Sequence, residues 1–323
     1  MFKVGIIGTG WIAQKMVVTL SSLEGYCVHA VGSRSKNSAD SFAEKWNIKR
    51  AYDSYEKLVE DEEIDLVYIA TPHSHHFEHA MLAINNRKPV LVEKAFTANS
   101  RQAEELISAA KSKGVFITEA IWTRYMPLSE KIKELLKSGI IGEPRVLTAT
   151  LCYMMENKER ILKPELCGGA LLDLGVYTLN FARMYFGTDI IQTVSNCIMG
   201  ETGVDMHESI SLTFADGKMA NLQSGALCLN DRQGIISGTK GYIRVDNINC
   251  PTQVDVYQNY VHVETYMAPK EMITGYEYQV IECKRCIDKG LLESPMMPHK
   301  ETISIMKQMD ELRKEWGVIY PMD

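Results

Sequence analysis

The sequence predicts an α/β protein with two domains: a doubly wound parallel sheet first, then an α+β domain with a large, mostly antiparallel open sheet. Short apolar runs alternate with helix-periodic segments as far as Glu119, which is typical of βαβ units. Strands joined by turns dominate the rest of the chain. The length of 323 residues also exceeds the usual size of a single hydrophobic core. We place a nucleotide-binding domain at residues 1–122 and a second domain at residues 123–323.

The first part of the chain contains five apolar runs, as expected for strands buried on both faces of a parallel sheet. These runs are residues 3–7, 26–31, 65–70, 89–92 and 115–118. Amphipathic segments of crossover-helix length are centred on residues 11–22, 37–47, 54–61, 74–86 and 99–113. Sheets of this kind bind ligands at the carboxyl ends of their strands, so we look for functional residues there.

The second part begins with a helix near residues 128–138, which Gly139 ends, and then changes to strands with β-branched alternation. The clearest hairpin joins residues 209–214 to residues 218–225 through Ala215-Asp216-Gly217, because Asp-Gly favours the tight turn. Further helices are expected near residues 170–186, 275–289 and 300–316. This alternation predicts antiparallel strands with helices packed against them.

Charge and composition favour small-molecule chemistry. The chain has 35 basic and 41 acidic residues, a net charge of −6, and no run of like charges that would suit nucleic acid or an anionic membrane. No segment approaches the roughly 18 uninterrupted apolar residues of a membrane-spanning helix. Glycines interrupt the apolar N-terminus, and no signal-peptide cleavage site follows it. We expect a soluble, cytoplasmic protein.

The eight cysteines are scattered through apolar segments, which favours free, mostly buried thiols over disulfides. Cys283 and Cys286 form a CxxC motif inside a helical pattern, without the second pair of a zinc site. His75 and His79, in the segment HSHHFEH, lie one helical turn apart and raise the alternative of a metal site. A solvent-exposed helix start explains these histidines equally well, and we expect no metal.

The strongest motif is GxGxxA at Gly8, Gly10 and Ala13, between the first strand and the first helix. Gly8 allows the tight turn, Gly10 lets the backbone approach a pyrophosphate, and Ala13 allows close packing of helix on strand. The helix N-terminus favours the negative charge of the phosphates. Gly8, Thr9, Gly10, Trp11 and Ile12 are therefore candidate cofactor contacts.

The end of the second strand indicates which nicotinamide cofactor is bound. An acidic residue there would bind a ribose hydroxyl, whereas an arginine accommodates the 2′-phosphate of NADP. The strand ends Val31-Gly32-Ser33-Arg34-Ser35, without an acid. The Arg34 guanidinium and the Ser33 hydroxyl match phosphate oxygens, so we expect NADP(H) in preference to NAD(H).

Two other strands end in residues suited to a site at the same edge. The third predicted strand is followed by Thr71, Pro72 and His73, with His76 a little further on, and these are further candidate cofactor contacts. The fourth ends at Glu93-Lys94. A partly desolvated lysine has a lowered pKa and can relay a proton, although a surface ion pair with Glu93 is the alternative.

Asp173 and Tyr177 lie four residues apart at the start of a predicted helix, so both project from one face. A phenol has an ordinary pKa of about 10 and acts as a base near neutral pH only if a cation stabilises the phenolate. Lys94 is the candidate cation. Spacing alone favours a structural tyrosine and a carboxylate at the helix N-terminus over this catalytic interpretation.

Taken together, these residues resemble the Gfo/Idh/MocA oxidoreductase family over essentially the whole chain, and within it the dimeric dihydrodiol dehydrogenases and NADP-dependent xylose dehydrogenases. The stretches that carry the likeness are GTGWIA, GSRS, ATPHSHH, EKAF, EAIWTRYMP, GGALLDLGVYTLNFA, ETGVD, SGTKG and ECKRCIDKGLLESPMMP. The resemblance implies a Rossmann domain, a second open-sheet domain that forms a homodimer, and hydride transfer between NADP(H) and a sugar or diol carbon.

The resemblance also implies roles for single residues. Lys94 falls on the family's catalytic lysine and Tyr177 on its catalytic position, with Asp173 beside it, whereas Ala95 replaces the usual proline of an EKP motif. Trp122 and Arg124 match a segment that lines the substrate pocket. Two alternatives stay open: a keto-sugar reductase of the same family, and a non-catalytic NADP(H)-sensing regulator.

Overall fold

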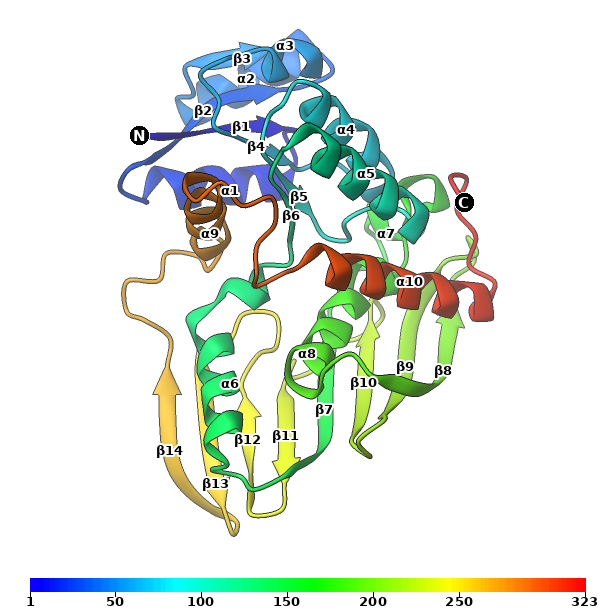
Figure 1. The fold of residues 1–323 in the computed structure, drawn as a ribbon. Helices are drawn as coiled ribbons and strands as arrows, with labels where there is room; N and C mark the ends of the chain where they lie inside the picture. The colour runs from blue at the N-terminus through cyan, green and yellow to red at the C-terminus, as the bar shows by residue number, and fades with distance from the viewer. The chain divides into compact units, whose positions relative to one another are not determined.

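The computed structural model describes all 323 residues, which form two compact units. The first unit comprises Met1–Trp122, Met272–Lys307 and Met322. The second comprises Thr123–Glu271, Gln308–Pro321 and Asp323. The long helix α10 (His299–Trp316) contributes residues to both units (Figure 1). None of the helices combines the length and apolar character needed to cross a membrane.

The first unit is built on a six-stranded, entirely parallel sheet of order β3-β2-β1-β4-β5-β6. Its strands are β1 (Phe2–Ile7), β2 (Tyr26–Gly32), β3 (Arg50–Tyr52), β4 (Leu66–Ile69), β5 (Val90–Glu93) and β6 (Ile117–Ala120). Its helices are α1 (Trp11–Ser21), α2 (Lys36–Trp46), α3 (Tyr55–Val59), α4 (His76–Asn85), α5 (Ser100–Lys113) and α9 (Glu277–Asp288). The predicted doubly wound sheet is confirmed, with its order reversing between β1 and β4.

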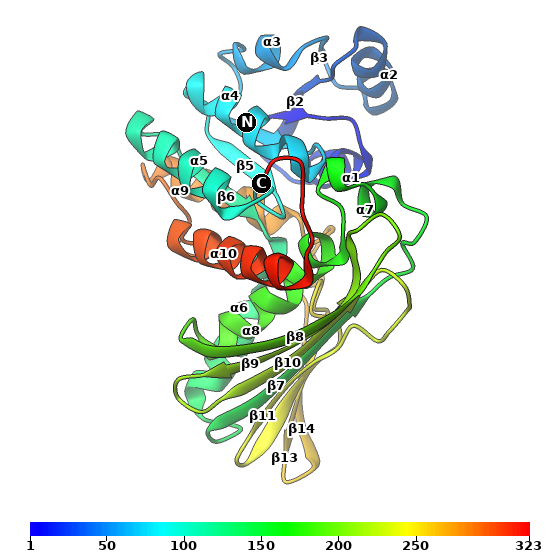
Figure 2. The same ribbon diagram turned by 90° about the vertical axis from the view of Figure 1, so that its right-hand side faces the viewer.

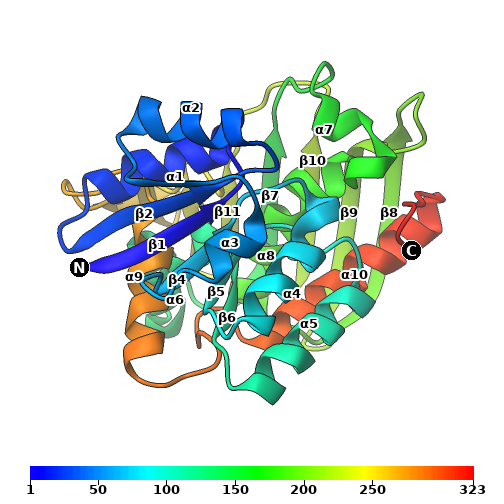
Figure 3. The same cartoon turned by 90° about the horizontal axis from the view of Figure 1, so that it is seen from above.

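Both faces of this sheet are covered, as its apolar strands require (Figure 3). Val4 and Ile6 of β1 belong to a core cluster with residues of α1, α2 and α9. Gly5, on the opposite face, lies against Ile64 and against Leu58 of α3. Alternate residues of one strand thus serve two layers of helices.

The helix α9 belongs to the first unit, although the sequence pattern places residues 123–323 in the second domain. Its Val280, Cys283 and Cys286 are completely buried in the core cluster of the first sheet. Burial of this apolar helix face against β1 and α1 explains why the chain returns to the first unit.

The second unit contains an eight-stranded sheet of order β14-β13-β12-β11-β7-β10-β9-β8, in which only β7 and β10 are parallel neighbours. Its strands are β7 (Pro144–Cys152), β8 (Ile190–Met199), β9 (Asp205–Phe214), β10 (Met219–Gly225), β11 (Gly234–Gly238), β12 (Gly241–Val245), β13 (Gln253–Gln258) and β14 (Val261–Met267). The helices α6 (Pro127–Ser138) and α8 (Val176–Phe186) lie on one face of it, and α7 (Glu159–Leu162) is a short helix in the connection after β7 (Figure 2). The mostly antiparallel sheet is as predicted.

Candidate active site

The turn between β1 and α1 requires glycine for a physical reason. Gly8 has a φ of +110°, and a Cβ there would lie 2.8 Å from the carbonyl oxygen of Ala70. A Cβ on Gly10 would meet no atom within 4 Å, and no side chain caps the first turn of α1. The turn therefore combines a positive φ at Gly8, open space beside Gly10 and backbone amides at the start of α1 that no side chain caps. These features fit the pyrophosphate of a dinucleotide.

The other residues of this turn have different surroundings. Trp11 is exposed, and the Lys15 Nζ lies 5.4 Å from the centre of its ring. Thr9 is half-buried, and Ile12 packs partly against the core of the sheet. Ala13 is completely buried, where a larger side chain would push α1 away from the strands.

The end of β2 presents Arg34 to solvent. Its neighbour Ser33 is buried and donates its backbone N–H to the carbonyl of Tyr52 at 3.1 Å. Ser35 caps α2 by accepting the N–H of Ser38 at 3.3 Å. Arg34 itself is exposed and takes part in none of the protein's ion pairs. Its charge therefore stays available at the place where the 2′-substituent of a dinucleotide ribose is recognised.

The segment after β4 is held together by histidines that make polar contacts. His76 is completely buried, with Nε2 2.8 Å from the carbonyl oxygen of Thr71 and Nδ1 2.9 Å from that of Ala95. Burial lowers the pKa of His76 to about 4, so the ring is neutral near pH 7. The neutral ring lies between the ends of β4 and β5, and its single N–H donates to one of these two carbonyl oxygens. These contacts fix the ring of His76, and the predicted contact of His76 with the cofactor stays a prediction.

The neighbouring residues of this segment are nearer the surface. His73, in a single 3-10 turn, has Nε2 3.1 Å from the carbonyl oxygen of Lys94, and Pro72 begins that turn. His79 lies 3.0 Å from the Thr71 hydroxyl through Nδ1, and burial lowers its pKa to about 4. His73 and His79 thus each have a polar partner within hydrogen-bond distance inside the protein.

The end of β5 places Lys94 directly after a buried carboxylate. Glu93 accepts a hydrogen bond from the Tyr68 hydroxyl, and its Oε2 lies 3.3 Å from the backbone nitrogen of Lys94. Lys94 is half-buried, and the Lys94–Ala95 peptide bond is cis. The carbonyl of Lys94 faces His73 and that of Ala95 faces His76, so histidines on the β4 side hold both backbone groups.

The candidate pocket residues Trp122 and Arg124 are buried and firmly anchored. Trp122 stacks on Tyr276, with ring centroids 4.1 Å apart and planes inclined by 9°. The Arg124 Nε donates to the Asn180 Oδ1 at 2.5 Å, and the Asn180 amide donates to the carbonyl of Val176 at 2.7 Å. Through Asn180, Arg124 is tied to the first turn of α8.

Asp173 and Tyr177 lie on a helix that begins irregularly. Leu171–Gly175 form a π turn that continues directly into α8, and both side chains are buried. A π turn widens the backbone and is frequent at functional sites. The Arg160 guanidinium, on α7, lies 2.6 Å from Asp173 Oδ1 in a charge-assisted pair. Arg160 belongs to this site. It was not predicted from the sequence because the connection after β7, which contains the four-residue helix α7, has no motif or periodicity that marks a functional residue.

A buried carboxylate from β9 holds the start of this helix. Asp205 Oδ2 accepts the backbone N–H of Leu171 at 2.5 Å. A Cβ on Gly169, whose φ is +109°, would lie 2.4 Å from Asp205 Oδ1, so glycine is needed for this approach. Burial raises the pKa of Asp205 to about 6. Asp205 is therefore a positioning residue for the helix that carries Asp173 and Tyr177.

A second carboxyl, Glu208, lies on the same strand. Its Oε1 accepts the Ser224 hydroxyl at 2.5 Å, and a Cβ on Gly175 would lie 2.7 Å from that oxygen. Burial and the negative charge of Asp205 raise the pKa of Glu208 well above its usual range. Asp205 and Glu208 thus form a pair of buried carboxyls beside the start of the helix.

We expect the Asp205→Asn variant to reveal this buried carboxyl through the pH dependence of stability. The raised pKa, about 6 against an ordinary 3.8, means that the folded state keeps a proton which the unfolded chain releases. That contribution to the free energy of unfolding is complete below about pH 4 and is lost as the pH rises through about 6. Wild type should therefore lose roughly 2 to 3 kcal/mol relative to Asp205→Asn between pH 4 and 7.

The measurement is urea denaturation of both proteins across this pH range, with an Asp216→Asn control. Asp216 is exposed in the hairpin turn after β9, and its pKa is lowered by Lys218. A stability difference between wild type and Asp205→Asn that does not change with pH would contradict the assignment.

The predicted residues thus form two groups. The first unit gathers the glycine turn, Arg34, the segment after β4 and Lys94 at the carboxyl ends of its parallel strands. The second unit holds Asp173 and Tyr177 on one helix, with Arg124 tied to that helix through Asn180. The two units therefore hold separate sets of candidate residues: a glycine turn and strand ends in the first, and a buried phenol one turn from a paired carboxylate in the second.

The fold and the nucleotide-binding turn define an oxidoreductase with a Rossmann domain. Two family models match the chain: "Oxidoreductase family, NAD-binding Rossmann fold" over residues 2–120, and "GFO/IDH/MocA C-terminal domain" over residues 129–244. The chain belongs to the Gfo/Idh/MocA oxidoreductase family, which confirms the family predicted from sequence.

Curated relatives are similar over the full length. The chain is 36% identical to trans-1,2-dihydrobenzene-1,2-diol dehydrogenase of Danio rerio, an alignment that covers 99% of this chain and 98% of that protein. It is 32% identical to the Homo sapiens enzyme of the same name, with the same coverage. The resemblance to dihydrodiol dehydrogenases is therefore confirmed as well.

Solved structures share the fold at lower identity. A 3-ketoreductase from Actinomadura kijaniata, in complex with NADP and TDP-benzene, aligns with a TM-score of 0.87 at 23% identity over 97% of both chains. An aldose-aldose oxidoreductase from Caulobacter crescentus, complexed with glycerol, gives 0.89 at 20% identity over 98% of this chain and 97% of the other. Both likenesses support the two-sheet architecture.

Proposed function

We propose that this protein is an NADP(H)-dependent oxidoreductase that transfers a hydride between nicotinamide and a hydroxyl-bearing carbon of a sugar or a trans-dihydrodiol. The observation that carries the proposal is Tyr177, a buried phenol one turn beyond a carboxylate paired with Arg160. The full-length similarity to trans-dihydrodiol dehydrogenases supports the substrate class. The first unit would bind the cofactor, and the second would supply most substrate contacts, with Trp122 and Arg124 bordering them.

In the oxidative direction, Tyr177 takes the proton of the substrate hydroxyl while the C–H bond of the same carbon breaks. The bound nicotinamide supplies the acceptor for that hydride. The carbinol becomes a carbonyl, and Tyr177 then releases its proton to solvent. Lys94 stabilises the phenolate form of Tyr177, and Asp173, held by Arg160, orients the substrate hydroxyl. In the reductive direction Tyr177 donates the proton.

The preference for NADP(H) rests on Arg34, and we expect Arg34→Ala to remove it. A charge-assisted hydrogen bond to a phosphate contributes about 1.5 to 3 kcal/mol, so KM for NADP⁺ should rise about 10- to 100-fold. KM for NAD⁺ should change less than about two-fold, since NAD lacks this phosphate. The test is steady-state kinetics with both cofactors, with Arg145→Ala as a surface control. An equal change of KM for NADP⁺ and NAD⁺ would refute the role of Arg34.

We also propose a homodimer through the open face of the eight-stranded sheet. Val146, Val194, Ile198 and Met219 are exposed apolar residues on β7, β8 and β10. Exposed apolar side chains gathered on one sheet face indicate an interaction surface. Light scattering should give about twice the monomer mass of 36.5 kDa, and a mass near the monomer value at working concentration would contradict the dimer.

The proposal is tested by following NADP⁺ reduction by absorbance across a panel of aldoses, polyols and trans-dihydrodiols, with NAD⁺ in parallel. Turnover that depends on NADP⁺ supports it. Keto-sugars with NADPH form the reverse arm, because a 3-ketoreductase shares the fold. Tight NADPH binding without turnover in either direction would favour a nucleotide-sensing regulator and refute the enzyme.

A further inference from the structure

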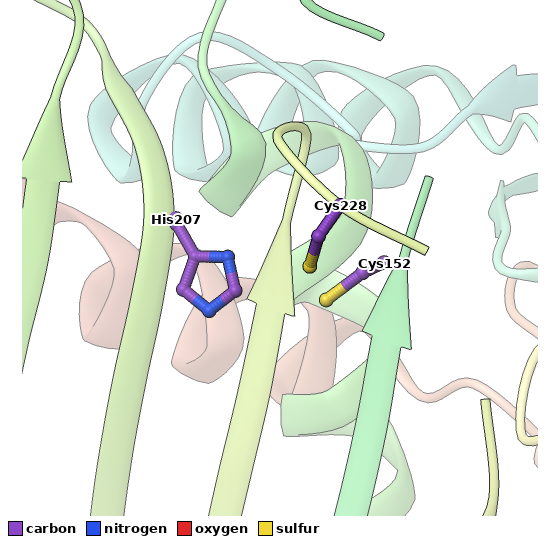
Figure 4. Close-up of side chains that lie close together, drawn as sticks. All are labelled: Cys152, His207 and Cys228. Atoms are coloured by element: carbon purple, nitrogen blue, oxygen red, sulfur yellow. The ribbon is translucent and has the colours of Figure 1, made fainter. Parts of the chain in front are cut away.

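Three soft metal-ligating side chains converge in the second unit, on the sheet that carries the apolar patch, where His207 is paired with Ile198. Cys152 ends β7, His207 lies near the start of β9, and Cys228 lies in the loop after β10 (Figure 4). One ligand atom from each of the three lies within 4.8 Å of the other two. Widely separated parts of the sequence supply them, so no local motif marks the group.

The register of the sheet explains why these side chains meet. Gly225 of β10 is paired with Cys152 of β7 on one side and with His207 of β9 on the other. Residues directly opposite one another share a face of the sheet, so the two donors flank a central glycine. A Cβ on Gly225 would lie only 2.1 Å from His207 Nδ1. The missing side chain is therefore what lets the imidazole lean over β10 towards Cys152.

Hydrogen bonds hold the loop that carries Cys228 against β7. The Asn230 Oδ1 accepts the backbone N–H of Cys152 at 3.0 Å and that of Arg232 at 3.1 Å. The Thr150 hydroxyl donates to Asp231 Oδ1 at 3.2 Å. Cys152 itself is only 2% exposed. The third donor is thus held in place by specific side-chain bonds.

We propose that Cys152, His207 and Cys228 form a metal site that binds Zn²⁺. Two thiolates and a neutral imidazole are the ligand set that soft to borderline d¹⁰ cations prefer, and two thiolates neutralise the charge of a divalent ion. Tetrahedral zinc holds such donors about 3.5 to 3.8 Å apart, so binding requires a contraction of at most about 1 Å. A water molecule completes the fourth position. The bound ion ties the ends of β7 and β9 to the loop after β10.

Cobalt substitution tests the site in the intact protein. The protein is first treated with a chelator in a metal-free buffer that contains a reductant. Co²⁺ is then titrated while the near-ultraviolet and visible spectra are recorded. Finally, Zn²⁺ is added to compete with Co²⁺. We expect one equivalent of Co²⁺ to give thiolate-to-cobalt absorption and visible bands typical of tetrahedral coordination. Zn²⁺ should abolish both. It should also raise the melting temperature, because a ligand that binds only the folded state stabilises it.

Three variants give the test its specificity. Cys152→Ser and Cys228→Ser should each lose the thiolate absorption and weaken Co²⁺ binding more than about 100-fold, since each removes a direct ligand. Cys197→Ser, at a half-buried cysteine on β8, should behave as wild type. The proposal is overturned if wild type shows no thiolate absorption, if Cys228→Ser retains it, or if Cys152 and Cys228 prove to be joined by a disulfide under reductant.

Discussion

Replacing Tyr177 by phenylalanine should lower turnover by about 10² to 10⁴-fold while leaving NADPH binding intact. The variant keeps the buried ring and its packing but removes the hydroxyl that exchanges the substrate proton, and general acid–base catalysis contributes an effect of this size. The measurement is kcat for NADP⁺ reduction, with the Kd for NADPH from fluorescence titration. Because Tyr177 belongs to the second unit, we expect the nucleotide cradle of the first unit to keep its affinity within about two-fold.

Tyr260→Phe is the matched control for this prediction. Tyr260 is 94% exposed in the turn between β13 and β14, so the same loss of a hydroxyl should leave kcat unchanged there. Turnover of Tyr177→Phe within a few-fold of wild type would remove Tyr177 from the mechanism and leave it as a structural tyrosine.

Replacing Lys94 by methionine should lower turnover by about 10²-fold or more and shift the rate profile to higher pH. Methionine has a similar length and apolar stem but no charge, so the phenolate of Tyr177 loses its stabilising cation and the phenol ionises at higher pH. The change is measured as kcat from pH 6 to 10. The shift distinguishes an electrostatic role from a structural one, which would lower kcat equally at every pH.

Lys57→Met controls for the loss of a positive charge. Lys57 is exposed on α3 and pairs with Asp53 at 2.7 Å, so its replacement should leave both kcat and the pH profile unchanged. If Lys94→Met keeps near-full turnover, or loses turnover without a shift of the profile, its proposed action on Tyr177 is wrong.

Most of the fold could be predicted because the spacing of apolar residues along the chain reflects which side chains are buried. The runs that became β1, β4 and β5 are mostly apolar, as burial between two helix layers demands, with Lys3 and Glu93 as the charged exceptions. β3 was missed because Arg50–Tyr52 has only three half-buried residues, too few to show a period. The position of α9 in the first unit was also not predicted from the sequence. The apolar face of a helix shows that the helix packs on something, but it does not show which of the two sheets that is.

The candidate site was predictable where residues lie close in sequence. The glycine turn and Arg34 follow the ends of neighbouring strands, so topology alone brings them to one edge. The π turn before α8 was not predictable, because it depends on Asp205, a strand residue distant in sequence that binds the helix start. Arg160 and the Cys152, His207 and Cys228 group were missed for the same reason: only tertiary contacts bring them together.

The most direct test of the proposed hydride transfer uses trans-1,2-dihydrobenzene-1,2-diol that carries deuterium on both carbinol carbons. The diol is incubated with NADP⁺ and the protein, and the NADPH formed is analysed by mass spectrometry. Direct transfer predicts NADPH with a single deuterium and a slower rate than with the unlabelled diol. NADPH without deuterium, or a protein that binds NADPH tightly yet turns over neither the diol nor any sugar of the panel, would contradict it.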